Sequence, residues 1–188
     1  LFDQVGFPKN RAVKEGFESL AKIIIGQQIS TIVAKKIFNK LIKDNMLNEK
    51  NVSETSIEKL KLYGLSSQKS LYLQNLASLI KNKDIDFGSF RHMPGEDLTN
   101  LLIKIKGIGK WTINNYKIFA LQDVDAWPSA DLALQEAVRM IKQLNDRPNQ
   151  DQMEIIGKIW KPYRGAAALF LWHLYNKVKI EKRIFNYV

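Results

Sequence analysis

Residues 101–121 read LLIKIKGIGKWTINNYKIFAL, two apolar-rich segments joined by a Gly-x-Gly turn at residues 107–109. Glycine permits the positive φ angles that a tight reversal needs, and it leaves the backbone N–H groups uncovered. The second segment begins directly after the turn, so its first amides lack helical partners and carry the positive end of the helix dipole. We expect two helices around this turn within residues 96–121, with Ile105 and Ile108 packed inward.

A turn of this kind can hold a phosphate oxygen, because its amides and its dipole both favour an anion. Lys104, Lys106 and Lys110 surround it and add an attraction that does not depend on base sequence. A plain connection between two helices would have the same outline, and Gly-x-Gly alone is a weak signal. The three lysines favour phosphate binding.

The composition of the whole chain agrees with a polyanionic partner. The 188 residues include 29 Lys and Arg against 19 Asp and Glu, a net charge of +10. Such a balance is typical of nucleic-acid-binding proteins, although a lysine-rich surface without such a partner gives the same total. The absence of cysteine excludes a disulfide scaffold, a Cys-ligated zinc site, an iron–sulfur cluster and a cysteine nucleophile. The two histidines, His92 and His173, are too far apart in sequence to indicate a metal site.

Hydrophobic periodicity predicts an all-α fold. Apolar residues recur at helical spacing within residues 34–42, 73–80 and 153–160, and no segment alternates with period two. The length fits one domain or two small ones. The longest apolar, uncharged stretch, residues 165–176, is shorter than the roughly 20 residues of a membrane-spanning helix. No signal-peptide pattern opens the chain, and no membrane association is expected.

Capping residues place the helix boundaries. Ser30, Ser56 and Ser66 are expected to begin helices that end near residues 44, 63 and 81. Ser129 is expected to begin another, which ends near residue 144. Residues 84–94 are expected to form a loop, and further helices are expected over residues 150–160 and 164–178.

The stretch WPSADLAL, residues 127–134, places Asp131 in the first turn of an expected helix. The helix dipole stabilises a carboxylate there, and a purely structural role is the more common one. A chemical role requires a reaction that needs a fixed anion near bound DNA. Cleavage of an N-glycosidic bond is such a reaction, because the departing base leaves positive charge on the sugar.

The tryptophans offer aromatic surfaces for a base. Trp111 follows the Gly-x-Gly turn directly, and Trp172 lies in the apolar stretch FLWHLY. A base extruded from DNA needs stacking partners. A cationic, alkylated base gains about 0.5–2 kcal/mol more from an indole face. Packing in the core is the alternative for each, and it is favoured for Trp160.

With these features the chain resembles the helix-hairpin-helix DNA glycosylase superfamily (HhH-GPD), and within it the alkylation-repair enzymes of the 3-methyladenine DNA glycosylase II type. The blocks that carry the resemblance follow the family's order over most of the chain: residues 17–20 with 24–30, 105–112, 125–134, and 160–164 with 171–173.

The resemblance implies two helical subdomains that flank a cleft. Residues 17–125 would form the central subdomain with the hairpin, and residues 1–16 with 126–188 would form the terminal one. Asp131 matches the catalytic aspartate, and Trp111 and Trp172 match aromatic residues of the base pocket. Gly107, Gly109 and Thr112 match positions whose backbone amides hold a DNA phosphate, and Lys110 is expected to add its charge there. Gln28 matches the residue that wedges into the duplex. The backbone carbonyls of Ile103, Ile105 and Ile108 match a site for Na⁺ or K⁺.

Departures from the family pattern refine the expected reaction. Bifunctional relatives carry a catalytic lysine where this chain has Trp111, and Lys110 lies one residue earlier, about 100° around the helix. Some relatives also bind an iron–sulfur cluster through four cysteines, which are absent here. We therefore expect no AP lyase activity and no required cofactor. Some relatives have tyrosines at the positions of Asn115 and Leu132, so the preferred base stays open.

The resemblance thus implies a monofunctional DNA glycosylase that removes alkylated purines in base excision repair. Its partner would be double-stranded DNA with a damaged base, and the protein would be a monomer. It would be located in the nucleoid-containing cytoplasm of a prokaryote or in the nucleus of a eukaryote. The alternatives are a glycosylase for another damaged purine and a non-catalytic helix-hairpin-helix DNA-binding protein.

Overall fold

The computed structural model describes residues 5–185, with side chains as far as Lys179. Helices dominate, and no β-strand forms within this range, which confirms the predicted all-α class. The chain divides into two compact units. The middle unit comprises Val13–Tyr116, and the terminal unit combines Leu1–Ala12 with Lys117–Val188.

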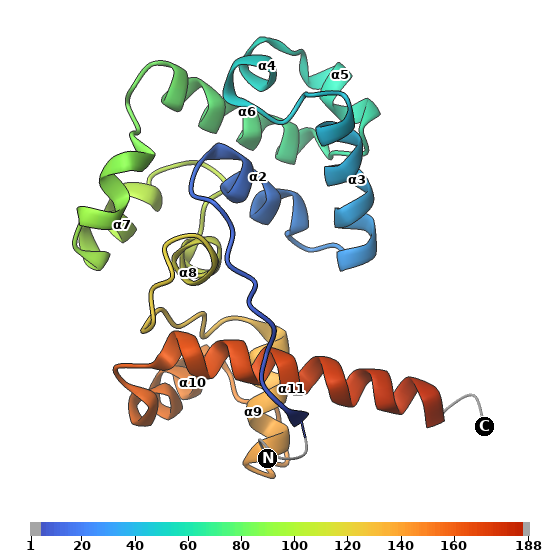
Figure 1. Cartoon of the computed structure of the whole chain (residues 1–188), viewed down its shortest axis with the longest axis vertical. Helices are drawn as coiled ribbons and strands as arrows, with labels where there is room; N and C mark the ends of the chain where they lie inside the picture. The colour runs from blue at the N-terminus through green and yellow to red at the C-terminus, as the bar shows by residue number, and fades with distance from the viewer. Residues whose placement is uncertain (1–4, 186–188) are drawn as a thin grey trace. The chain divides into compact units, whose positions relative to one another are not determined.

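Helix α6 is the centre of the middle unit, because it packs against three other helices, α2, α4 and α5 (Figure 1). Leucine and isoleucine side chains of α2 and α6, among them Leu20, Ile24, Leu73 and Leu76, are fully buried. The helices of this unit are α2 (Phe17–Gly26), α3 (Thr31–Lys43), α4 (Glu49–Glu54), α5 (Ile57–Leu62), α6 (Ser67–Lys81), the 3₁₀ helix η1 (Phe87–His92), α7 (Gly95–Leu102) and most of α8 (Lys110–Phe119).

The predicted serine caps of the middle unit are confirmed. Ser30, Ser56 and Ser66 each accept a hydrogen bond from the amide three residues further on. The loop expected over residues 84–94 is wrong in part, since it contains η1. The physical reason is tertiary: Phe90 is buried and packs its ring edge-on against Tyr116.

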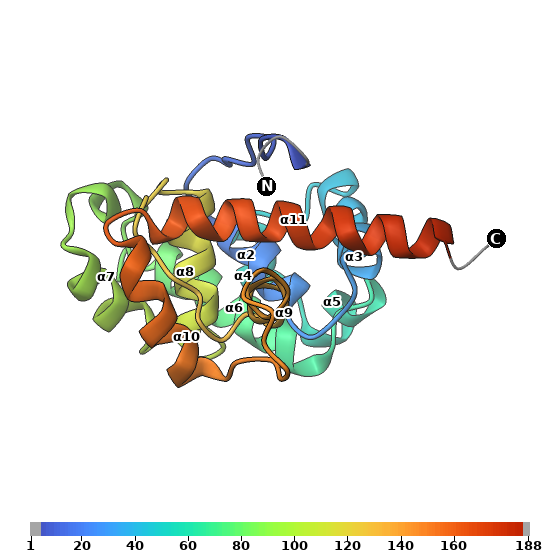
Figure 2. The same cartoon turned by 90° about the horizontal axis from the view of Figure 1, so that it is seen from below.

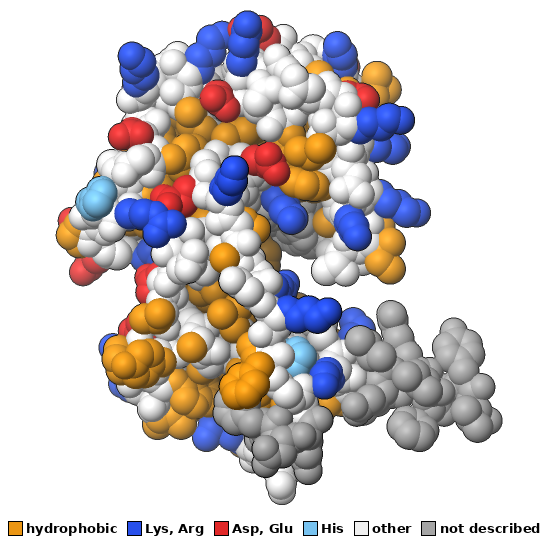
Figure 3. Space-filling view, viewed as in Figure 1, with side chains coloured by type: hydrophobic (Ala, Val, Ile, Leu, Met, Phe, Trp, Pro, Cys, Tyr) orange, Lys and Arg blue, Asp and Glu red, His pale blue; other side chains and the backbone are white. Residues whose placement is uncertain are grey.

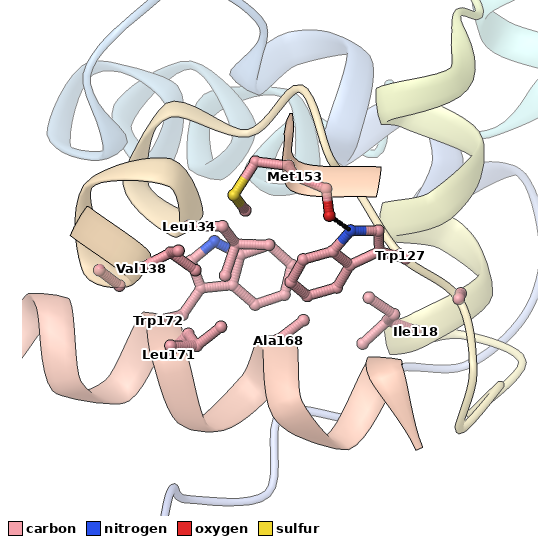
Figure 4. Packing of buried hydrophobic residues seen from close by; sticks show 10 residues of the cluster. Ile118, Trp127, Leu134, Val138, Met153, Ala168, Leu171 and Trp172 are labelled. Carbon is pink, nitrogen blue, oxygen red and sulfur yellow. Dashed lines mark hydrogen bonds between the residues drawn. The ribbon is translucent and has the colours of Figure 1, made fainter. Parts of the chain in front are cut away.

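The terminal unit is built on the long helix α11 (Arg164–Phe185), across which α9 (Leu132–Ile141) lies (Figures 1 and 2). Its remaining helices are α10 (Gln150–Gly157) and the 3₁₀ helix η2 (Lys158–Trp160). Trp127 is buried in the core and donates its indole N–H to the Met153 carbonyl at 3.0 Å (Figure 4). The imidazole Nε2 of His173 lies 2.8 Å from the Val5 carbonyl oxygen, so the N-terminal segment belongs to this unit.

The boundaries between the units were expected at residues 16/17 and 125/126. In the structure they lie at residues 12/13 and 116/117. The second boundary falls inside α8, because Ile118 is buried in the core of the terminal unit whereas Tyr116 is buried in the middle unit. Residues 117–125 therefore belong with the terminal unit and not with the hairpin. No helix in the described part of the chain is long and apolar enough to cross a membrane.

Candidate nucleic-acid interface and active site

The predicted pair of helices around the Gly-x-Gly turn is present in the middle unit. Helix α7 ends at Leu102 and α8 begins at Lys110. The side chains of Ile105 and Ile108 are buried, as predicted, and the Ile108 amide donates to the Ile105 carbonyl at 3.0 Å. The turn is thus anchored by its two isoleucines, which leaves its backbone at the surface.

The two glycines of the turn serve different purposes. Gly107 has a φ of 92°, and a Cβ there would lie 2.2 Å from the ring of Tyr72. Both the backbone conformation and the close packing therefore require glycine. Gly109 has open space where its Cβ would be. A side chain at residue 109 would fit the free protein, so packing does not require glycine there.

Gln27 contacts the hairpin, although its sequence position alone does not predict these contacts. Its side-chain Nε2 donates to the Gly107 carbonyl at 3.0 Å and to the Thr112 Oγ1 at 2.9 Å. The Thr112 side chain is buried and turned inward by this bond. Any contact of Thr112 with DNA therefore rests on its backbone amide, as the resemblance implies.

Gln28, the expected wedge, lies beside the hairpin. A cavity of about 740 Å³ in the middle unit is lined by residues that include Gln28, Lys69, Tyr72, Gly107 and Gly109. The Gln28 side chain is exposed, and its backbone has a φ of 55°, which is uncommon for a residue other than glycine. The structure thus brings the wedge candidate and the hairpin glycines to one hollow surface.

The hairpin lysines Lys104, Lys106 and Lys110 are all exposed. Lys and Arg side chains are spread among acidic ones over the visible face of the middle unit (Figure 3). The net positive charge is thus not gathered in one block on this face. What distinguishes the three hairpin lysines from the other basic residues is that their positive charge lies around the turn.

Asp131 is the N-cap of α9, which corrects the expected cap at Ser129 and the expected helix over residues 129–144. The Asp131 amide donates to the Pro128 carbonyl, so a turn precedes the helix and delays its start. The Asp131 Oδ1 accepts from the Leu134 amide at 2.9 Å and from the Trp172 Nε1 at 3.0 Å. Two donors from different elements thus orient one half-buried carboxylate.

Trp172 has a contact that the sequence did not reveal. It is 7% exposed in the core of the terminal unit (Figure 4). Its ring stacks on Phe119, with ring centroids 5.4 Å apart. Its indole N–H is the donor to Asp131. The base-stacking role implied by the resemblance stays a prediction, but Trp172 also positions the carboxylate.

Trp111 lies half-buried in the first turn of α8, and its carbonyl accepts from the Asn115 side chain at 2.8 Å. Asn115 is buried, whereas Leu132 is exposed. Trp111 belongs to the middle unit with the hairpin, and Asp131 and Trp172 belong to the terminal unit. Among the described residues, no group of three or more His, Asp or Glu side chains could hold a metal ion.

Known proteins share both this sequence and this architecture. The family model described as "HhH-GPD superfamily base excision DNA repair protein" matches residues 21–162. The chain belongs to the HhH-GPD superfamily.

Relatives of this HhH-GPD protein include the alkylbase DNA glycosidase-like protein mag2 of Schizosaccharomyces pombe, 32% identical over 84% of this chain and 77% of mag2. Bacillus subtilis YfjP is 30% identical over 83% of this chain, which spans 58% of the length of YfjP. The solved structure of the S. pombe 3-methyladenine DNA glycosylase Mag1 with abasic DNA has a TM-score of 0.84 at 27% identity, and the match covers 95% of this chain and 89% of Mag1.

An ion pair between Arg164 and Asp125 anchors the segment that leads to Asp131. The Arg164 guanidinium donates to both carboxylate oxygens of Asp125, at 2.9 and 2.7 Å, and the Arg164 amide donates as well. These hydrogen bonds hold the pKa of Asp125 below its ordinary value. Asp125 is thereby fixed to the start of α11, the helix that also carries Trp172.

Proposed function

We propose that this HhH-GPD protein is a monofunctional DNA glycosylase that hydrolyses the N-glycosidic bond of alkylated purines of the 3-methyladenine type. The observation that carries the proposal is the Asp131 carboxylate, held by two N–H donors at the start of α9. Its Schizosaccharomyces pombe relative with a solved structure is named a 3-methyladenine DNA glycosylase, which supports the choice of substrate.

Binding of the duplex is assigned to the hairpin of the middle unit. The amides around Gly109 and at the start of α8 offer hydrogen bonds and a positive dipole end to a DNA phosphate. Lys110 adds a charge that attracts any duplex. Gln28, exposed beside the hairpin, fills the place that the extruded nucleotide leaves. The proposed partner is double-stranded DNA with a damaged base.

The chemistry is assigned to Asp131. A purine alkylated on its ring is cationic, so it leaves as a neutral base when it takes the bonding electron pair of the N-glycosidic bond. The sugar then carries positive charge at C1′, and a fixed carboxylate stabilises that state. Water adds its oxygen to C1′ and loses a proton, which gives an abasic site and a free base. Such a leaving group needs no strong general acid.

The reaction is proposed to stop at the abasic site. A lyase step needs an amine that forms a Schiff base with C1′. Trp111 stands where bifunctional relatives have that lysine, and Lys110 precedes it by one residue, about 100° around the helix.

A monovalent cation, Na⁺ or K⁺, is proposed at the carbonyls of Ile103, Ile105 and Ile108. These residues lie in the connection between α7 and α8, and carbonyl oxygens are suitable ligands for a hard cation. The Ile105 carbonyl accepts one hydrogen bond, from Ile108, and a carbonyl has a second lone pair. When bound, the ion would place positive charge beside a DNA phosphate. No other cofactor is proposed.

The protein is proposed to act as a monomer, since the hairpin and Asp131 come from one chain. The location proposed for it is that of its DNA substrate, the nucleoid of a prokaryote or the nucleus of a eukaryote.

Release of free 3-methyladenine from methylated duplex DNA tests the function. The intact protein is expected to release the base and to leave abasic sites, and the Asp131→Asn variant serves as the control for a contaminating enzyme. Binding of DNA without release of any base would favour the non-catalytic alternative. Release from deaminated or oxidised purines alone would favour the other glycosylase.

A further inference from the structure

Lys69, in the first turn of α6, makes a contact that its own helix does not need. Its Nζ donates to the Ile25 carbonyl at 2.7 Å and to the Gln27 carbonyl at 2.6 Å. These carbonyls end α2, which has no basic residue in its own last turn. A cation at a helix C-terminus satisfies carbonyls that lack helical partners and complements the dipole. Lys69 thus supplies to α2 a cap from another helix.

The residue that Lys69 holds is the one that binds the hairpin. Gln27 is the C-cap of α2, and its side-chain Nε2 reaches Gly107 in the turn at 3.0 Å and Thr112 in α8 at 2.9 Å. One amide group therefore links both sides of the turn that is assigned to the DNA phosphate. Its orientation depends on where the end of α2 lies, because the backbone and side chain of Gln27 are bound at the same time.

Helix α6 supports the turn a second time, one helical turn after Lys69. The ring of Tyr72 packs so closely against Gly107 that a Cβ on that residue would lie 2.2 Å away. The Tyr72 hydroxyl accepts from the Gln68 Nε2 at 2.6 Å, which fixes the ring. The start of α6 thus contacts the hairpin both directly and through Gln27. All of these residues lie within the middle unit.

We propose that Lys69 and Gln27 are positioning residues for DNA binding: Lys69 fixes the end of α2, and through Gln27 this end fixes the backbone of the hairpin. The same end of α2 leads directly into Gln28, so the contacts of Lys69 and Gln27 also fix the position of the wedge candidate relative to the phosphate-binding turn. Burial lowers the pKa of Lys69, as expected for a lysine partly withdrawn from water to serve a backbone site. The proposal rests on the proposed function only for the identity of the ligand, DNA.

The test measures the dissociation constant for undamaged duplex DNA in Lys69→Met and Gln27→Met. Each change removes two hydrogen bonds and leaves an unbranched side chain, of the same length for Gln27 and one atom shorter for Lys69, so we expect about tenfold weaker binding. Lys81→Met is the matched control: Lys81 lies at the other end of α6, pairs with Glu54, and carries the same charge. Lys81→Met is expected to bind DNA within about twofold of the parent affinity. Equal losses of affinity in Lys69→Met and Lys81→Met would show that Lys69 contributes only its positive charge, and this result would overturn the proposal.

A double-mutant cycle separates positioning from stability. If Lys69 acts through Gln27, Lys69→Met changes affinity little in the Gln27→Met background, whereas independent effects add. The backbone amide resonances of Gly107 and Gly109 are expected to shift in both single variants and not in Lys81→Met, and Lys69→Arg, which keeps a cation, is expected to restore most of the affinity. Additive losses with unshifted glycine resonances overturn the proposal. If Lys69→Met does not fold, Gln27→Met alone decides, since an unchanged affinity and unshifted resonances there also overturn it.

These readouts do not depend on catalysis. Failure of base release by the parent protein would remove the proposed function, yet binding and the glycine resonances would still report on Lys69 and Gln27. Normal base release together with unchanged binding in both variants would remove the positioning role and leave the proposed function intact.

Discussion

The Asp131 Oδ1 receives both the Leu134 amide and the Trp172 indole N–H, which fixes the direction of the carboxylate before any substrate arrives. Asparagine is an equally good N-cap and keeps an oxygen for both donors. We therefore expect Asp131→Asn to fold normally and to excise an alkylated purine about 100-fold more slowly or worse, because a comparable electrostatic group is worth about 3–4 kcal/mol in other enzymes.

Single-turnover excision, with the melting temperature measured in parallel, checks this expectation. Affinity for undamaged DNA should hold or increase, since removal of a negative charge lowers repulsion of the phosphates. If Asp131 serves only as a helix cap, the variant excises at the parent rate, and the proposed mechanism is wrong.

Trp172→Phe removes the indole donor to Asp131 and keeps an aromatic ring against Phe119. A lost hydrogen bond to a charged group corresponds to about tenfold in rate, so we expect about tenfold slower single-turnover excision. Trp127→Phe is the matched control, because Trp127 lies in the same core and donates to the Met153 carbonyl instead. Equal losses of rate in the two variants would show that general packing and not the bond to Asp131 is responsible.

The features that the sequence predicts and the hydrogen bonds that it does not reveal differ in how far apart their residues lie along the chain. Asp131 stands in a local helix-start pattern, so its position could be predicted from the residues that surround it. Its donor Trp172 lies 41 residues away, and Gln27 lies 80 and 85 residues from its two acceptors. Such hydrogen bonds leave no periodic signal in the sequence. Glutamine and tryptophan also occur at many positions where they make no hydrogen bond to a distant residue, so the residue type alone does not reveal one.

At the scale of the elements, the two hairpin glycines are expected to behave in opposite ways. Gly107→Ala forces a positive φ on alanine and presses its Cβ onto Tyr72, so we expect it to lower the free energy of unfolding by about 2–3 kcal/mol. Gly109→Val meets open space and is expected to cost no more than about 1 kcal/mol, yet to weaken binding of every duplex by about tenfold.

Thermal unfolding and binding to duplexes of different sequence, measured on both variants, check the pair. Unchanged duplex affinity in Gly109→Val would remove the hairpin from the DNA-binding surface.

The stability that the Asp125–Arg164 ion pair provides at the start of α11 is expected to depend on pH. The Arg164 guanidinium lowers the pKa of Asp125 in the folded protein, so the carboxylate contributes stability above its ordinary pKa near 4 and loses it as the pH falls through the lowered value. We expect Asp125→Asn to lower the free energy of unfolding at pH 7 by about 1–2 kcal/mol, a figure already reduced for the partial exposure of the pair.

Denaturant unfolding of the parent and of Asp125→Asn between pH 7 and pH 2 measures this contribution. The difference between them should shrink only at the acid end of the range. A difference that is constant over the whole range would show that Asp125 acts through packing and not through its charge.

Helix boundaries could be predicted where a local cap sets them and not where burial does. The predicted helix starts at Ser30, Ser56 and Ser66 are confirmed, because each serine side chain accepts a hydrogen bond from the amide three residues further on. Helix α4 was not expected, since only Val52 of its residues is buried and no apolar stripe marks it. At α9, a turn that uses the Pro128 carbonyl moved the cap from Ser129 to Asp131, and a sequence with two good capping residues does not show which one is used.

At the scale of the whole molecule, the outcome of the reaction is expected to be hydrolysis alone. Borohydride added during the reaction with damaged or abasic DNA should trap no covalent adduct, because Trp111 offers no amine. Gel electrophoresis of the denatured mixture detects an adduct. A trapped species would show that Lys110 or another lysine reaches C1′, and the absence of a lyase step would then be wrong.

The all-α class was predictable because periodicity reports on burial over whole helices, and the family blocks identified Asp131 and the hairpin. The division of the chain was less predictable. Lys117 through Asp125 contain no break in composition, and only the packing of Ile118 into the terminal core shows on which side they belong.

The order of the two units along the chain has a consequence for biosynthesis. Translation proceeds from the N-terminus, so residues 13–116 leave the ribosome while later parts of 117–188 are still unmade or inside the exit tunnel. The hairpin unit can therefore fold on the ribosome, whereas Val5 must wait for α11, which carries its partner His173. A pause in translation after about residue 150 would leave Asp131 synthesised without Trp172, its donor on α11. The nascent chain thus acquires the hairpin before it acquires an oriented carboxylate, so the proposed base removal would have to wait for α11.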